Sequence, residues 1–468
     1  MEEEKLNKPQ TDKRSERSYL VARDLREFQD QLSESGDLVT VKKTVSTEHE
    51  IAAYIRRSCK TGGPAFLFTN VAEHQGWTVA GGTYAVLNRV YKAVGASKEE
   101  AVKRYLDATV NPMAVERVST GVVKEVQLSG NQIDLASIPL VKHCEKDGGR
   151  YITAGIQVVR DPETGVQHLG IHRMMLQDKR LLTLWGGLER RVRRTITRNE
   201  DRSKNTPIAI VLGGPPAFVL ASCARVPHFG KKYDIASAIQ GRPLEVVQCD
   251  TNDLEVPAWS EMVLEGEVLC KERMEEGPFG EFSGAYGPKT SSPVVRIDKI
   301  TMRQDAIYQT FLTGFPMCED QSLMWLPRTA VVMQDASRAH PEVKAATWLV
   351  DSGDVYGVAV SIRKRMDGEP YNIISAILGG AALVKSCIVV DEDVDVFDPV
   401  QVQWALSTRV QPDRDILKFP VMVGAPLDPS APIPRHTSKI GYDATVPLKA
   451  DRLHYERVYV PGEDDVTW

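Results

Sequence analysis

The stretch Tyr151–Arg173, YITAGIQVVRDPETGVQHLGIHR, decides the fold of the central part of this chain. Two β-forming runs, 151–160 and 166–176, lie on either side of the polar segment Asp161–Gly165. A segment with proline, aspartate and glycine between two such runs is typical of a hairpin turn. We therefore predict a β-hairpin at this position.

Strand-like segments continue on both sides of the hairpin and outline a β-rich central region. These segments, each bounded by turn residues, are 121–128, 208–212, 244–249, 262–269 and 293–303. Their alternating pattern predicts a mixed barrel or sheet domain.

The regions that flank this domain have the pattern of α/β structure. Leu25, Phe28 and Leu32 recur at helical spacing after Asp24, which is a suitable N-cap. We predict an α+β or α/β multidomain protein. Its parts are a charged tail (1–18), an N-terminal α/β region (19–115), the central domain (116–305) and a C-terminal α/β domain (306–468).

The composition of the 468 residues indicates a sizeable core and no strong charge bias. Hydrophobic residues make up 42% of the chain, and 58 Lys and Arg oppose 63 Asp and Glu, which gives a formal charge of −5. These values exclude a small disulfide scaffold and a disordered chain. They also argue against a general binder of nucleic acids, while a local basic patch remains compatible with them.

The seven cysteines are scattered, and none forms a Cys-x-x-Cys pair. This pattern indicates free thiols in a reducing compartment rather than zinc sites or a disulfide framework. No apolar run reaches about 18 residues, and the N-terminus lacks the apolar segment of a secretory signal. We therefore expect a cytoplasmic protein that does not enter a membrane.

The segment Glu275–Glu281, EEGPFGE, is a first candidate for chemistry. Two glycines and a proline restrict the backbone between the carboxylates of Glu276 and Glu281, so both could be oriented to transfer a proton. The alternative interpretation is an exposed turn with solvated acids.

A second candidate is the strand that follows the hairpin turn. Its alternation would place His168 and His172 on one face and Arg173 on the other. Two imidazoles on one face could bind a metal ion or a phosphate, although paired polar residues on a half-exposed face are commoner. Gly170 would let a ligand approach the backbone, or it would mark a bulge.

The stretch Glu189–Lys204 is strongly basic. It could bind a phosphate, a CoA-like polyanion or RNA, but the lack of interleaved aromatic residues favours a solvated amphipathic helix. The chain contains no dinucleotide-binding glycine motif, Walker A loop, nucleophile elbow or HExxH motif. Ordinary dehydrogenase, kinase, hydrolase and zinc-protease functions therefore lack support.

Five stretches in this order resemble the UbiD family of reversible decarboxylases, as does most of the chain from about residue 23 to 447. They are Tyr151–Arg173, Gly241–Gly266, Glu276–Gly284, Asp391–Arg409 and Thr437–Thr445. The resemblance implies an N-terminal α/β region, a split β-barrel that binds prenylated FMN, and a C-terminal domain that mediates assembly. In the family a strand arginine and two glutamates form the catalytic network, which here are Arg173, Glu276 and Glu281.

The resemblance also implies a reaction. Glu281 would give a proton to the carbon that loses CO2, while Glu276 pairs with Arg173 and orients it. Prenylated FMN would be the electron sink. The implied substrate is an α,β-unsaturated or (hetero)aromatic carboxylic acid, with cinnamic, benzoic, heteroaromatic and CoA-linked acids all open. A separate flavin prenyltransferase would supply the cofactor, and the subunit would form a homodimer or a homohexamer.

This chain differs from the family at the metal site. Family members usually hold Mn2+ against the flavin phosphate with an Asn, a His and a Glu. The corresponding positions are His168, then Glu189 or Arg190, and Lys232. A protonated lysine has no free lone pair, so Lys232 should weaken divalent binding and, with Arg190, neutralise the phosphate directly. We therefore expect no Mn2+. His168 is the best candidate ligand if a metal binds, and a potassium ion remains compatible with the sequence.

The resemblance implies a wider set of residues around the cofactor. The residues expected to bind it are His168, Gly170, Ile171, His172, Arg173, Arg190, Ser222, Cys223, Pro227 and Lys232. Arg225 stands in the same loop where the family usually has a proline. Two other interpretations stay open. One is a UbiD-like subunit or partner protein with impaired catalysis, and the other is a polyanion-binding module that uses residues 189–204.

Overall fold

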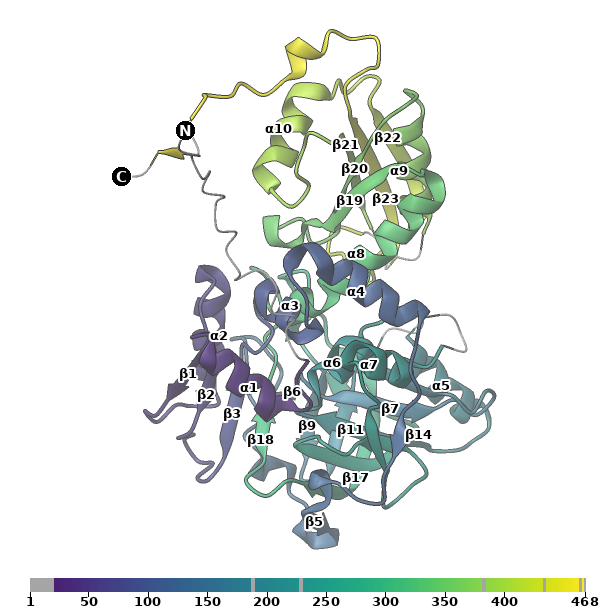
Figure 1. The fold of residues 1–468 in the computed structure, drawn as a ribbon. Coiled ribbons are helices and arrows are strands. Elements are labelled where there is room, and N and C mark those ends of the chain that lie inside the picture. The colour runs from purple at the N-terminus through teal and green to yellow at the C-terminus, as the bar shows by residue number, and fades with distance from the viewer. Residues whose placement is uncertain are drawn as a thin grey trace, which may run out of the picture.

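The computed structural model of the protein, shown in Figure 1, describes residues 21–186, 190–226, 230–380, 384–431, 435–462 and 465–466. The elements form an N-terminal α/β region, a central β-rich domain and a C-terminal α/β domain, which confirms the predicted fold class. The C-terminal domain, in green and yellow, lies on one side of the other two (Figure 1). In the described part of the chain, no helix is long and apolar enough to cross a membrane.

The predicted hairpin is present. Strand β7 (Ile156–Arg160) pairs antiparallel with β8 (Gln167–Ile171). In the turn, the carbonyl of Asp161 accepts a hydrogen bond from the N–H of Gly165 at 2.9 Å. Gly165 has a φ of 69°, a left-handed conformation that glycine adopts without strain. The turn residues therefore fix the register of the hairpin.

The central sheet curls into a half-barrel. Its strand order is β6-β9-β10-β17-β14-β11-β7-β8, so β8 is at one end of the path and β9 (Met174–Asp178) lies next to the other. Only His172 and Arg173 connect β8 to β9, which brings the two ends together. The prediction that these two residues continue β8 on opposite faces is wrong, because the chain leaves the hairpin after Ile171 to reach the other end of the sheet.

Two long strands form the middle of this sheet. β14 (Met262–Glu276) pairs antiparallel with β17 (Thr290–Met302), and the register shifts twice, between Glu265 and Gly266 and between Val268 and Arg273. The other strands of the sheet are β5 (Val126–Ser129), β6 (Tyr151–Ile152), β10 (Leu181–Leu184) and β11 (Thr206–Leu212). Small sheets beside it are made by β4 (Glu116–Arg117), β12 (Glu245–Gln248) and β13 (Glu255–Pro257), and by β15 (Phe279–Gly280) and β16 (Tyr286–Gly287).

Three helices accompany the central sheet, namely α5 (Arg191–Asp201), α6 (Pro216–Ser222) and α7 (Lys232–Gln240). Helix α5 lies in the basic stretch and buries Val192 and Ile196 among its neighbours on the sheet. The prediction of an amphipathic helix in this stretch is therefore confirmed.

The N-terminal region begins with α1 (Leu25–Glu34), as predicted. The carboxylate of Asp24 accepts a hydrogen bond from the N–H of Glu27 at 2.8 Å and caps the helix, and Phe28 and Leu32 are buried. The other helices of this region are α2 (Glu50–Thr61), α3 (Leu87–Val94) and α4 (Lys98–Val110).

A strand from much later in the chain completes the N-terminal sheet. Strand β18 (Ile307–Gln309) pairs in parallel with β3 (Thr78–Gly81), and the sheet order is β1-β2-β3-β18. The other two strands are β1 (Leu38–Val41) and β2 (Ala65–Phe68). The domain boundaries given above stay a prediction.

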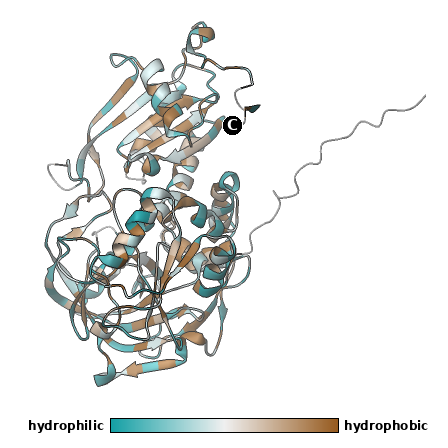
Figure 2. Cartoon of the chain, turned by 90° about the vertical axis from the view of Figure 1, so that its left-hand side faces the viewer, coloured by the Kyte–Doolittle hydropathy of each residue, from teal (hydrophilic) through white to brown (hydrophobic). Residues whose placement is uncertain are grey.

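The C-terminal domain holds a five-stranded sheet of order β19-β20-β21-β23-β22. Its strands are β19 (Val343–Trp348), β20 (Gly357–Ile362), β21 (Ser386–Asp391), β22 (Ile416–Val423) and β23 (His436–Ala444). Its helices are α8 (Glu319–Ala339), α9 (Glu369–Gly379) and α10 (Pro399–Arg409). Hydrophobic and hydrophilic segments are interleaved along the strands (Figure 2), as expected for sheets whose faces meet both core and polar surroundings. All seven cysteines are free thiols, as predicted.

Candidate active site

Arg173 lies between two buried carboxylates. Its Nε and Nη2 donate hydrogen bonds to the two oxygens of Glu276 at 2.7 and 3.0 Å, and its Nη1 donates to Oε1 of Glu281. The three residues are 7%, 0% and 6% exposed. Residues from two distant segments thus form one ion network, and the interpretation of the 275–281 segment as an exposed turn does not apply to these two acids.

Local backbone structure explains how the two glutamates reach the same arginine. Glu276 is the last residue of β14 and lies opposite Thr290 of β17, whose hydroxyl donates to its Oε2 at 3.3 Å. Gly277 follows with a φ of 96°, which strongly favours glycine, and turns the chain out of the strand. The N–H of Glu281 donates to the carbonyl of Ala285 at 2.8 Å and closes the loop.

Burial and the charge of Arg173 act in opposite directions on the carboxyl group of Glu281. Burial raises the pKa of Glu281 above its usual value, although the charge of Arg173 opposes this shift. Aromatic rings cover the guanidinium, with Trp185 at 4.5 Å and Phe279 at 4.8 Å from its central carbon to the ring centres. A permanent cation can bind an acid through its carboxylate. A carboxyl group beside that cation can then exchange a proton with the bound acid.

Lys232 is the first residue of α7 and faces the hairpin. Its Nζ donates to the backbone carbonyls of Leu169, at 3.0 Å, and Ser222. Burial lowers the pKa of Lys232 to about 7. Without a bound anion, burial thus favours the neutral amine of Lys232. A bound anion would favour its charged form.

Other residues expected at the cofactor gather around this lysine. Gly170 approaches the ring of His172 so closely that an added Cβ would lie 2.8 Å from Nε2. Burial, with the charges of Arg190 and Lys232, lowers the pKa of His172 to about 3, so the imidazole is neutral. Ile171 pairs with Ile156 across the hairpin. The structure brings these residues to one end of the half-barrel.

The remaining expected residues lie at the end of α6. The hydroxyl of Ser222 donates to the carbonyl of Val219 at 2.6 Å, and Sγ of Cys223 lies 3.8 Å from that hydroxyl. Burial raises the pKa of the Cys223 thiol. Pro227 and Glu189 lie outside the described residues.

At the expected metal site, the side chains of His168 and Lys232 already have partners in the protein. Nε2 of His168 lies 3.6 Å from the carboxylate of Asp161, which also pairs with Arg198, and Lys232 faces backbone carbonyls. No group of three His, Cys, Asp or Glu side chains suited to a metal occurs in the ranges that the structure describes. The absence of Mn2+ stays a prediction.

Four basic residues lie within electrostatic range of one another. Arg190, Arg225, Lys232 and Arg328, here called the cationic cluster, act on one another electrostatically and form no ion pair among the described residues. A phosphate dianion would offset these charges. Sequence reasoning did not identify Arg328; its only signal was an arginine inside the apolar run LMWLPRTAVV.

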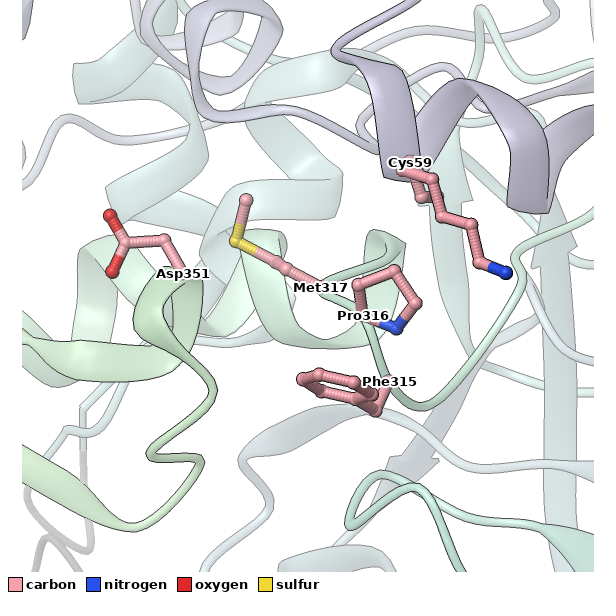
Figure 3. Close-up of a pocket in the computed structure, with 6 residues that line it drawn as sticks. Cys59, Phe315, Pro316, Met317 and Asp351 are labelled. Carbon is pink, nitrogen blue, oxygen red and sulfur yellow. The ribbon is translucent and has the colours of Figure 1, made fainter.

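A separate hollow of about 420 Å³ opens where α2, the segment before α8 and the start of the C-terminal domain meet (Figure 3). Its lining residues are Cys59, Lys60, Phe315, Pro316, Met317 and Asp351. None of the three residues of the ion network lines it.

Comparison with known proteins agrees with this fold. Three domains of the 3-octaprenyl-4-hydroxybenzoate carboxy-lyase family match the chain: the N-terminal domain over 29–109, the Rift-related domain over 115–316 and the C-terminal domain over 321–444. The chain therefore belongs to the UbiD family of decarboxylases, which are carboxy-lyases.

Individual relatives are similar over nearly their whole length. The anhydromevalonate phosphate decarboxylase of Methanothermobacter thermautotrophicus is 33% identical, with 93% of this chain and 99% of the relative covered. The phenolic acid decarboxylase of Bacillus subtilis is 31% identical, with 94% and 96% covered. The UbiD-class enzyme HmfF from Pelotomaculum thermopropionicum, solved with FMN, has a TM-score of 0.89 at 34% identity, with 95% and 99% covered. A dimeric form of HmfF was solved with prFMN.

Proposed function

We propose that this protein is a non-oxidative, reversible decarboxylase of an α,β-unsaturated or (hetero)aromatic carboxylic acid that uses prenylated FMN. The observation that carries the proposal is the buried network in which Arg173 bridges Glu276 and Glu281. The names of the phenolic acid decarboxylase and of the prFMN-bound HmfF support the substrate and cofactor classes. When bound, prenylated FMN supplies an electron sink for the electron pair that departing CO2 leaves on the substrate.

The chain's own residues bind the acid and move the proton. Glu276 holds Arg173 through two hydrogen bonds, so the guanidinium is fixed where it can attract the substrate carboxylate. As the bond to CO2 breaks, the proton of Glu281 forms the new C–H bond, and solvent then returns a proton to its carboxylate. In the direction of carboxylation, Glu281 removes that proton instead.

The proposal predicts CO2 release by the reconstituted holoenzyme. Protein co-produced with a flavin prenyltransferase is expected to show a flavin absorption band and an intact prenylated cofactor by mass. It should release CO2, and exchange hydrogen for deuterium, with at least one acid of a set spanning cinnamic, benzoic, heteroaromatic and CoA-linked acids. Protein made without the prenyltransferase is the control and should be inactive.

A fully loaded holoenzyme without exchange on any of these acids would instead favour the impaired-subunit alternative. The same preparation gives the oligomeric state, for which we propose a homodimer or homohexamer.

We further propose that Lys232 and Arg190 hold the flavin phosphate without a divalent metal. The Nζ of Lys232 contacts the carbonyl of Leu169 in the middle of β8, and Lys232, which stands where the family has a metal-binding acid, is only 9% exposed. A buried ammonium group with two backbone acceptors can add a phosphate oxygen as its third partner.

Chelation is therefore expected to leave the flavin in place. After dialysis against excess EDTA, the holoprotein should retain its flavin absorbance and contain far less than one Mn2+ per flavin by elemental analysis. Lys232→Met should weaken flavin binding by about tenfold or more, since a charge-assisted hydrogen bond is lost. Lys231→Met, which changes the exposed neighbouring lysine, should leave binding unchanged. One stoichiometric Mn2+ per flavin would refute this part of the proposal.

A further inference from the structure

Two cysteines from distant parts of the chain meet at the hollow shown in Figure 3. Cys59 lies near the end of α2, and Cys318 is the N-cap residue of α8. The Sγ of Cys318 donates a hydrogen bond to the Sγ of Cys59 at 3.0 Å. A disulfide bond joins sulfur atoms about 2.05 Å apart, so an approach of about 1 Å would allow this bond to form.

The two thiols differ in their access to solvent. Cys59 is partly exposed and lines the hollow, whereas Cys318 is 0% exposed. The hydrogen bond to Cys59, together with burial, raises the pKa of the Cys318 thiol, so Cys318 retains its proton. An oxidant that arrives from solvent therefore meets Cys59 first, and Cys318 is placed to react second.

Arg56, which lies one turn before Cys59 on α2, binds the segment that leads into Cys318. Its Nη1 donates hydrogen bonds to the carbonyl of Phe315 at 2.7 Å and to the Sγ of Cys318 at 3.1 Å. Its Nη2 donates to the carbonyl of Thr313 at 2.7 Å. A fixed cation beside the two sulfur atoms stabilises the negative charge that sulfur carries when it reacts as a thiolate.

The same segment, residues 313–318, packs against the loop that carries Glu281. The hydroxyl of Thr313 donates a hydrogen bond to the carbonyl of Gly280 at 2.5 Å. A Cβ added at Gly314 would lie 3.0 Å from the carbonyl oxygen of Glu281, so the two backbones are in close contact. A movement of this segment therefore reaches the backbone of the proposed proton donor.

We propose that Cys59 and Cys318 are a redox-sensitive thiol pair, which hydrogen peroxide converts to a disulfide bond that lowers turnover. The effect on turnover rests on the proposed function, whereas the formation of the bond does not. Joining the sulfur atoms draws the start of α8 and α2 together by about 1 Å and shifts the segment that contacts Gly280 and Glu281. A displacement of this size at a reacting group can lower a rate by about 10²-fold.

The proposed oxidation takes place in two steps. The Cys59 thiol loses its proton, its thiolate attacks one oxygen of hydrogen peroxide, and the O–O bond breaks. Cys59 becomes a sulfenic acid, and the departing hydroxide takes up a proton to form water. The sulfur of Cys318 then attacks the sulfur of Cys59, and its proton leaves with the OH group as a second water. Two thiols thus lose two electrons and two protons, and a dithiol reductant reverses the change.

Peptide mapping of the holoenzyme without reduction tests the bond and requires no turnover. After exposure to excess hydrogen peroxide, mass spectrometry should find the peptides of Cys59 and Cys318 joined, and dithiothreitol should separate them. In Cys318→Ser the second step is impossible, so dimedone should label the sulfenic acid on Cys59. Cys270→Ser changes another partly exposed cysteine and should leave the joined peptides unchanged. Absence of joined peptides from the oxidised wild type, or of the dimedone label from Cys59 in Cys318→Ser, would overturn the proposal.

CO2 release before oxidation, after oxidation and after dithiothreitol tests the effect on turnover. The wild-type rate should fall by about tenfold or more, and dithiothreitol should restore it. Cys59→Ser should start at the wild-type rate and show no loss that dithiothreitol reverses, and Cys59→Ala covers the case in which the serine variant does not fold. An equal reversible loss in these variants, or joined peptides without a loss of rate, would overturn the effect on turnover. Joined peptides in a reduced-active test that gives no CO2 release at any stage would instead refute the proposed function alone.

Discussion

Glu281→Gln is expected to lower the rate of CO2 release by about 10²- to 10⁴-fold, the usual contribution of a positioned general acid. Glutamine has nearly the same shape and can still accept the hydrogen bond from Arg173, but it carries no transferable proton. Hydrogen–deuterium exchange at the substrate carbon should fall with turnover. Flavin content, measured by absorbance, should stay at the wild-type level.

Glu275→Gln is the matched control. Glu275 is the neighbour of the catalytic pair in sequence, but its side chain is 68% exposed and pairs with Lys289 at the surface. That variant should keep wild-type rates. A fully active Glu281→Gln enzyme would remove Glu281 from the role of proton donor.

Arg173→Met is expected to abolish detectable CO2 release and to destabilise the protein in a pH-dependent way. Removing one partner of a buried ion pair costs about 3–5 kcal/mol, because the remaining charge is left uncompensated. Here two buried carboxylates lose their cation, so the pKa of Glu281, which burial already raises, should rise further in the folded variant above that of the unfolded chain. Groups with raised folded-state pKa values bind protons more tightly when folded, so the variant loses stability as pH rises.

The measurement is the midpoint of thermal unfolding at matched scan rates from pH 5 to pH 8. The difference between wild type and Arg173→Met should be small at pH 5, where the folded carboxyls can be protonated, and larger at pH 8. Arg180→Met provides the control, since Arg180 pairs with Asp298 at a half-exposed site. A midpoint difference that is independent of pH would contradict this account.

Local sequence patterns predicted the parts of the fold that depend on neighbouring residues. The cap at Asp24, the turn at Asp161–Gly165 and the amphipathic helix in the basic stretch each follow from side chains a few positions apart. The resemblance to a family indicated Arg173 and the two glutamates. From the residue spacing alone, Glu276 and Glu281 could also be solvated acids in an exposed turn.

Features that depend on distant segments could not be predicted. The exit of the chain from β8 after Ile171 follows from the curl of the whole sheet, so the strand-face argument for His172 and Arg173 did not hold. Arg328 of α8 reaches Trp348 of β19 within the C-terminal domain, and it meets Phe282 only where that domain folds against the central one. Neither contact has a signal in a local window of sequence.

The pairing of β18 with β3 also bears on how the polypeptide is made. During synthesis, β3 leaves the ribosome long before Ile307–Gln309, so the nascent N-terminal sheet has a bare edge until the whole half-barrel has been translated. An uncovered edge strand can pair with other chains, which makes this interval the time of greatest risk of aggregation. The N-terminal sheet thus emerges before the half-barrel and is completed only after it.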